Sequence, residues 1–303
     1  MHLFKQDWRF VDDTHLHSNR DALHSFAYDD TFCTLAGQGK SPATIRAWVH
    51  PATVVLGTQD SRLPHIHEGI AYLQESGYHV LVRNSGGLAV VLDEGVLNLS
   101  LIMKEEKGLS IDTGYELMYQ LIKTAFRGDG YEIEAGEIRG SYCPGRYDLS
   151  IDEKKFAGIS QRRLRGGVAV QIYLCLNGSG SGRAELIRRF YELSTQGVAT
   201  KFKYPLVKPS TMASMAELIN KPFTVKGTME KIGSTMMAHG AALATLPFTE
   251  EEQRLFTDQL TRVQNRNEKC LGVSNCQVEL CFSCIKKRAG EFFFLEFRLF
   301  IIL

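Results

Sequence analysis

The sequence lacks a surplus of charge of either sign. It has 35 Lys and Arg residues against 34 Asp and Glu residues, which gives a formal net charge of +1. A protein that binds nucleic acid through its overall charge needs a marked basic excess. The composition therefore argues against a general nucleic-acid binder and leaves only a local basic patch open.

Long hydrophobic runs are absent as well. No segment approaches the roughly 18 consecutive apolar residues that a membrane-spanning helix needs. The opening residues, MHLFKQD, contain no apolar stretch typical of a secretory signal. Among the seven cysteines, only Cys33, Cys143 and Cys175 fall in the first 250 residues. We therefore expect a cytoplasmic protein with free thiols and no membrane partner.

The rest of the composition is ordinary for a globular protein. Hydrophobic residues make up 44% and charged residues 23% of the chain. These values exclude collagen-like, coiled-coil and wholly disordered classes. A chain of 303 residues can bury a large core, either in one α/β domain or in two smaller ones.

Hydrophobic periodicity predicts strands first and helices later. Runs rich in Val, Ile and Leu, separated by glycines, predict strands at 44–50, 54–57, 79–83, 88–92, 97–103, 131–135, 147–151, 156–159 and 168–176. Apolar residues at helical spacing predict helices at 19–35, 111–126, 185–193, 215–220, 225–242 and 250–268. The links joining 79–83, 88–92 and 97–103 are short, which favours antiparallel neighbours. This order indicates an α+β (or α/β) fold with a helical C-terminal portion.

The last residues depart from this pattern. Four cysteines (Cys270, Cys276, Cys281 and Cys284) crowd together before a phenylalanine-rich end. Zinc sites usually present two paired ligands on each side, and only Cys281 and Cys284 have that spacing. We therefore expect no metal site and assign the tail no function.

Two segments carry residues suited to chemistry. The first is RNSGG at 83–87, where adjacent glycines let a ligand approach the backbone N–H groups; a plain hairpin turn is the alternative. The second is GSYCPGRYDLSI at 140–151, where Pro-Gly places Cys143 in a loop. Cys33 and Cys175 fall in a helix and an apolar strand and are expected in the core.

A lysine near Cys143 would favour its thiolate. Lys155 starts the strand that follows the Cys143 loop, and in a straight hairpin it lies too far from the thiol for a hydrogen bond. The Pro-Gly segment would have to fold back to bring the two together. Spacing alone leaves this pairing open.

These two segments and KKFAGISQRRLRGGVAVQIYL at 154–174 resemble the biotin/lipoate protein ligase A/B family. The resemblance covers about residues 7–270 and implies one catalytic domain over 1–270, with its core at about 40–245 and a tail at 271–303. It implies a mixed, largely antiparallel sheet with flanking helices. Within the family, the Cys143 segment is most similar to that of the cysteine-bearing acyltransferases.

The resemblance also implies roles for individual residues. Cys143 matches the family's acyl-thioester nucleophile, and Lys155 matches the lysine that makes this thiol more acidic. Residues that match the acyl-binding motif or adjoin the matching lysine are Arg83, Ser85, Gly86, Gly87 and Gly158. The ligase motif has a further Gly and a His where this chain has Leu88 and Leu92. These departures argue against adenylate binding, and we expect no cofactor.

The function implied is transfer of octanoyl, in lipoate biosynthesis, from a lysine of the glycine-cleavage H protein to the lipoyl domains of 2-oxoacid dehydrogenases. Three alternatives stay open: the same nucleophile with acyl carrier protein as donor, an ATP-dependent lipoate ligase, and a catalytically idle acyl- or lipoyl-domain-binding module.

Further expectations concern the surroundings of the thiol. Backbone N–H groups of Gly86, Gly87 or Gly158 are candidates to hold the developing oxyanion. The candidates to line an acyl tunnel are Leu88, Val90 and Leu149, for which core packing is the alternative. A basic patch of Arg162, Arg163 and Arg165 suits acidic lipoyl domains, or is simply a solvated charge run.

Overall fold

A computed structural model describes residues 4–15, 22–128 and 130–272. Two sheets organise this part of the chain. The larger has the strand order β11 (Ala242–Ala244), β1 (Asp7–Asp13), β2 (Ala43–Trp48), β6 (Val96–Lys104), β10 (Gly167–Cys175), β9 (Lys154–Leu164), β8 (Asp148–Ile151) and β7 (Glu134–Ala135). The smaller has the order β4 (His79–Val82), β3 (Thr53–Leu56) and β5 (Val90–Leu92).

The larger sheet is mixed and mostly antiparallel, as expected. β1 pairs in parallel with β2 and β11. Every other pairing in this sheet, from β2 to β7, is antiparallel.

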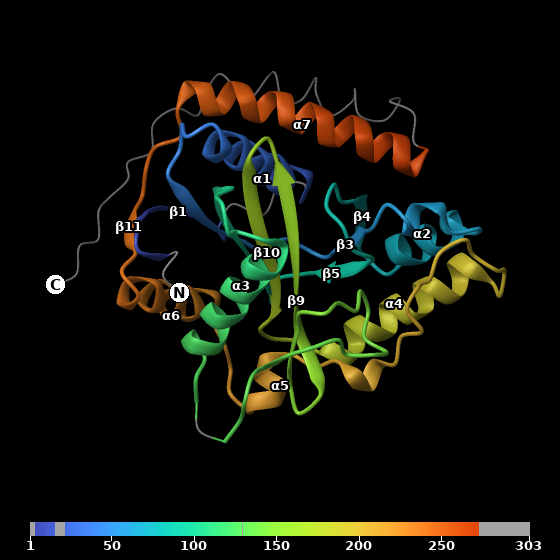
Figure 1. Ribbon diagram of the computed structural model, residues 1–303. Helices are drawn as coiled ribbons and strands as arrows, with labels where there is room; N and C mark the ends of the chain where they lie inside the picture. Colours follow the sequence, from blue (N-terminus) through green and yellow to red (C-terminus); the bar gives the residue numbers. More distant parts are fainter. Residues whose placement is uncertain (1–3, 16–21, 129, 273–303) are drawn as a thin grey trace.

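Helices cover both faces of the larger sheet (Figure 1). The seven α-helices of the described residues are α1 (Ala22–Gly37), α2 (Ile66–Glu75), α3 (Ile111–Ala125), α4 (Gly180–Thr195), α5 (Met215–Ile219), α6 (Val225–Ala238) and α7 (Glu250–Leu271). α3 and α6 pack with one sheet face in one hydrophobic core. α1, α4 and the smaller sheet pack over the other face, and α7 lies along α1. The residues of this second core range from Ala22 to Val263, whereas the resemblance implied a domain core at about 40–245.

The expected antiparallel pairing of 79–83, 88–92 and 97–103 is wrong. β4 and β5 do not pair with each other but flank β3, and β6 lies in the other sheet between β2 and β10. β3, which precedes all three segments in the chain, takes both β4 and β5 as partners, and the buried β6 joins the larger sheet between β2 and β10. Short links therefore did not decide the partners.

Further elements differ from the sequence-based expectation. β1, α2 and β11 were not predicted, α6 ends at Ala238 rather than at 242, and β9 is longer than the expected strand at 156–159. The added part of β9 has the polar sequence SQRRL, which gives no hydrophobic signal. The predicted start of α7 is confirmed, because Thr249 and Glu252 form a capping box there.

Candidate active site

One row of residues across the larger sheet forms the floor of a cavity of about 270 Å³. The register aligns Trp48, Asn98, Tyr173, Gly158 and Asp148 on five successive strands, β2, β6, β10, β9 and β8. Side chains at aligned positions share one face of a sheet. All five residues line the cavity, so the strand register itself builds this floor.

The opposite wall is apolar. It comes from Phe26 of α1, Val55 of β3, and Val90 and Leu92 of β5. The Phe26 and Trp48 rings meet edge to face with centroids 6.3 Å apart. The smaller sheet and α1 therefore close the cavity into an apolar slot, which suits an aliphatic chain.

Cys143 lies at this cavity, in the loop that the Pro-Gly pair predicted. The residue is half-buried and has a φ of 44°, a left-handed conformation that is uncommon outside glycine. Its Sγ accepts a hydrogen bond from the Leu88 N–H at 3.1 Å and lies 3.6 Å from Nη2 of Arg83. A backbone donor and a guanidinium therefore both face the sulfur.

The two glycines before Leu88 permit this approach. Gly87 has a φ of 110°, and a Cβ there would lie 3.0 Å from the Arg83 guanidinium. Arg83 is itself buried and also donates to the Leu88 carbonyl. The segment thus wraps around the guanidinium and directs one N–H at Cys143, rather than acting only as a turn.

Lys155 of β9 contacts the same loop. Its side chain is fully buried, and its Nζ donates to the carbonyl oxygens of Tyr142 at 2.9 Å and Cys143 at 2.8 Å. The Pro-Gly segment folds back so that the backbone of Cys143 meets Lys155, but no hydrogen bond joins Nζ to Sγ among the described residues. Nζ contacts these loop carbonyls, the Ser141 hydroxyl at 3.4 Å and the Asp148 carboxylate, whereas Sγ contacts Leu88 and Arg83.

Asp148 completes this arrangement and was missed at the sequence level. It lies 2.9 Å from Nζ of Lys155 and accepts from the N–H groups of Gly145 at 3.1 Å and Ile138 at 3.2 Å. Burial raises the pKa of Asp148, while the charge of Lys155 opposes that rise. The available signal was a carboxylate in the otherwise apolar strand YDLSI.

All the residues expected to bind the acyl group line the cavity: Arg83, Ser85, Gly86, Gly87 and Gly158. Gly158 is needed because a Cβ there would lie 2.7 Å from the Tyr173 ring. Val90 also lines the cavity. Leu149, by contrast, is fully buried in the core on the other face of the sheet, so it is not a tunnel residue.

The expected basic patch is largely neutralised. Arg162 pairs with Asp30 of α1 at 2.8 Å, and Arg163 pairs with Glu105. Arg165 lies exposed at the turn between β9 and β10. Pairing within the chain removes most of the charge that would attract an acidic partner.

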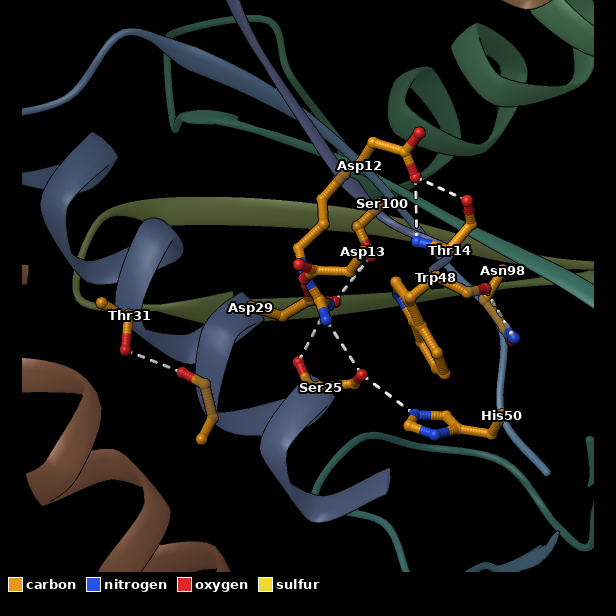
Figure 2. Close-up of polar contacts among 12 residues, drawn as sticks. Asp12, Asp13, Thr14, Ser25, Asp29, Thr31, Trp48, His50, Asn98 and Ser100 are labelled. Atoms are coloured by element: carbon orange, nitrogen blue, oxygen red, sulfur yellow. Dashed lines mark hydrogen bonds and ion pairs between the residues drawn. The ribbon is translucent and has the colours of Figure 1, made fainter. Parts of the chain in front are cut away.

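A buried polar network supports the slot from the side of β2 and α1 (Figure 2). The Arg46 guanidinium contacts Asp29 at 3.0 Å and the Ser25 hydroxyl at 2.9 Å, and that hydroxyl lies 3.0 Å from Nε2 of His50. Burial raises the pKa of Asp29, while the charge of Arg46 opposes that rise. This network fixes Arg46 beneath the Trp48 ring, 5.6 Å from its centroid.

Comparison with known proteins identifies the family. The model of the lipoyl protein ligase A/B catalytic domain matches residues 21–237. The chain belongs to this family. It is 53% identical over 273 residues to octanoyl-[GcvH]:protein N-octanoyltransferase of Bacillus velezensis, covering 89% of this chain and 95% of the relative.

A second relative at similar identity carries another acyl group in its name. Lipoyl-[GcvH]:protein N-lipoyltransferase of Listeria monocytogenes is 50% identical over 271 residues, covering 89% of this chain and 98% of the relative.

Solved structures agree on the fold. Lipoate-protein ligase A bound with ATP aligns with a TM-score of 0.66 at 16% identity, covering 89% of this chain and all of the other. A putative lipoate protein ligase from T. acidophilum with bound lipoic acid aligns with a TM-score of 0.64 at 16% identity, covering 84% and 95%.

Two expected absences concern the described residues only. In that part of the chain no cluster of His, Cys, Asp and Glu could hold a metal ion. Cys276, Cys281 and Cys284 lie outside it. No helix among those residues is both long and apolar enough to cross a bilayer.

Proposed function

We propose that this chain transfers octanoyl from a lysine of the glycine-cleavage H protein to a lysine of a lipoyl domain, through a thioester on Cys143. The observation that carries the proposal is the position of Sγ: it lies at the apolar slot, with the Leu88 N–H and the Arg83 guanidinium directed at it. The relatives' names supply the acyl group and the donor. The reaction belongs to the cytoplasm, where the thiol stays reduced.

The chemistry is a double displacement. The Cys143 thiolate attacks the carbonyl carbon of octanoyl-lysine, the C–N bond breaks, and the donor lysine leaves as an amine after taking up a proton. A neutral acceptor lysine then attacks the thioester, its nitrogen releases the extra proton to solvent, the C–S bond breaks, and the thiolate is restored. Both ends are lysine amides of similar free energy, so the transfer is reversible and needs no ATP.

The groups around Cys143 have different roles. Arg83 and the Leu88 N–H stabilise the thiolate, because a charge-assisted hydrogen bond contributes roughly twice as much as a neutral one. Lys155 adds positive charge beneath the loop, but Asp148 at 2.9 Å largely cancels it. We therefore assign Lys155 chiefly to holding the loop, and through the loop to setting the reactivity of Cys143.

The oxyanion needs its own donor, and two groups at the slot can serve. Gly87 provides a backbone N–H beside Arg83. The Tyr173 hydroxyl is buried and has no hydrogen-bond partner among the described residues. Gly158, the other expected donor, is less suited because the hairpin register directs its N–H toward Tyr173 of β10.

Lipoyl transfer is a second candidate, favoured by the relative from Listeria monocytogenes. A lipoyl group has the same eight-carbon chain with two added sulfur atoms. The same slot and nucleophile would serve both acyl groups, so the transfer assay must include both donors.

Intact-mass spectrometry tests the proposal. The enzyme is mixed without nucleotide with octanoylated H protein and an unmodified lipoyl domain, and in parallel with lipoylated H protein. Octanoyl should move to the lipoyl domain, the reverse mixture should run backward, and Cys143→Ala should stop both reactions. Cys270→Ser, which removes another half-buried thiol, is the matched control and should keep full activity.

Other donors give outcomes that contradict the proposal. Transfer only with ATP and free octanoate would establish a ligase. Transfer only from octanoyl acyl carrier protein would establish the other transferase, and binding of the lipoyl domain without any transfer would establish an idle binding module.

A further inference from the structure

Strand β9 continues well past its neighbour β8. The last aligned pair between them is Asp148 with Gly158, whereas β9 runs on to Leu164 beside β10. Figure 1 shows β9 and β10 side by side through the middle of the molecule. Among residues 4–15, 22–128 and 130–272, no strand pairs with β9 from Ile159 onward on the side where β8 lies. The larger sheet therefore has an open edge there.

The hairpin register fixes which backbone groups face this edge. Arg165 and Gly166 form a two-residue turn with φ values of 50° and 79°, so Leu164 and Gly167 are the hydrogen-bonded pair that closes it. Alternation then directs the N–H and C=O of even-numbered residues of β9 toward β10. Those of Ile159, Gln161 and Arg163 face outward. In the described part of the chain no backbone hydrogen bond satisfies them.

Side chains hold this edge in place. Gln161 donates to the carbonyl of Ile111, at the start of α3, and Arg163 donates to that of Leu109 at 2.8 Å. Both anchors belong to the segment that leads into α3. The edge is thus fixed as an extended strand before any partner binds, which lowers the entropy cost of adding one.

The open edge adjoins the candidate active site. Ile159, Ser160 and Gln161 line the same cavity as Cys143. A strand added along this edge would take the line of β8 and end where β8 begins, at the loop of Cys143 and Asp148. An extended partner segment of about five residues, roughly 16 Å long, would span it.

We infer that residues 159–163 of β9 pair with the extended segment that presents the acylated or acceptor lysine of the carrier proteins. The inference rests on the proposed function and adds how those proteins dock. Main-chain hydrogen bonds supply affinity without reading sequence, which suits an enzyme that must accept both a donor and an acceptor. The lysine at the end of the added strand then enters beside Cys143.

Amide hydrogen exchange, read residue by residue by NMR, tests the pairing. In the full-length enzyme alone, the amides of Ile159, Gln161 and Arg163 should exchange quickly and those of Ser160 and Arg162 slowly. Saturating unmodified lipoyl domain should slow the odd-numbered amides at least tenfold and leave the even-numbered ones unchanged. Unchanged odd-numbered amides in the saturated complex would overturn the inference. Protection in the enzyme alone that grows with its concentration would also overturn it, by indicating pairing with a second copy.

A proline at the outer end of the edge gives a functional test. Arg163→Pro removes an outward N–H, which an edge strand tolerates, and Arg163→Ala removes only the side chain. Arg163→Pro should raise the KM for octanoylated H protein about tenfold relative to Arg163→Ala. Acylation of Cys143 by a small octanoyl thioester should stay within twofold in both variants. Equal KM values would contradict the pairing, whereas a wild-type enzyme that no thioester acylates would contradict the proposed function instead.

Discussion

Replacing Lys155 by Met should expose how much the buried Lys155–Asp148 pair contributes. The substitution keeps the length of the side chain and removes its charge and its donors. It leaves the Asp148 carboxylate, whose side chain is only 2% exposed, without its cation. The carbonyl oxygens of Tyr142 and Cys143 lose their donor at the same time.

The expected loss is large because the partner stays behind. Removing one member of a buried ion pair costs about 3–5 kcal/mol of unfolding free energy. Asp148 keeps only its N–H donors from Gly145 and Ile138. The double variant Lys155→Met with Asp148→Asn removes the unpaired charge, so it should regain at least half of that loss.

The loss should also grow with pH. Burial already raises the pKa of Asp148 above its ordinary value of 3.8, and loss of Lys155 removes the charge that opposes this rise. A native state that holds the proton more tightly than the unfolded chain loses stability as pH rises through that range. The gap between wild type and Lys155→Met should therefore be smaller at pH 4 than at pH 8.

Urea unfolding of the wild type, both single variants and the double variant at these two pH values gives the measurement. Iodoacetamide alkylation of Cys143 in the same samples reports on the loop, and Lys155→Met should slow it. A loss below about 1 kcal/mol, or a double variant no more stable than Lys155→Met, would refute this account of the pair.

Four other predictions concern single side chains and the tail. Cys143→Ala should form no acyl-enzyme in the mass spectrum while still binding the lipoyl domain; any acylated mass would contradict the nucleophile. Arg83→Met should slow alkylation of Cys143 about tenfold, since a hydrogen bond to a charged group contributes about 1.5 kcal/mol; an unchanged rate would remove Arg83 from that role. Asp60 is buried just after β3, where its carboxylate accepts hydrogen bonds from the Gly57 N–H and the Tyr191 hydroxyl. Burial raises the pKa of Asp60 to about 6, so its ionisation should lower the unfolding free energy by about 2–3 kcal/mol between pH 4 and pH 7. In Asp60→Asn that contribution should vanish from urea titrations, and an equal fall in both proteins would count against it. A chain ended after Gly272 should transfer octanoyl at the wild-type rate because α7 is complete; lost turnover would give the tail a function.

Local patterns predicted most elements because their signals are local. Apolar residues at helical spacing located α3 and the start of α7. Proline and glycine placed Cys143 in a loop, and an apolar strand placed Cys175 in the core. The acyl-binding site and the cysteine nucleophile were expected only from the family resemblance of the RNSGG and GSYCPG segments, because spacing alone left a hairpin turn open for the first.

Partners across the sheet were beyond the reach of these patterns. The sequence gives no signal that β6 pairs with β2 and β10, because strand pairing joins residues far apart in the chain. The polar half of β9 has no hydrophobic period, so its length follows only from its pairing with β10. Asp148 could not be recognised as the counter-ion of Lys155, because the β8–β9 register and the folded-back loop bring them together.

By itself, then, the sequence determined the reactive groups: the thiol of Cys143, the guanidinium of Arg83, the glycines between them and the buried charges that need partners. Only the tertiary structure decided which group touches which. Arg83 rather than Lys155 faces the sulfur. The loop of Cys143 folds over β9, so the Nζ of Lys155 donates to carbonyl oxygens of this loop instead. Those contacts depend on strand register and loop closure, which depend in turn on the packing of the whole core.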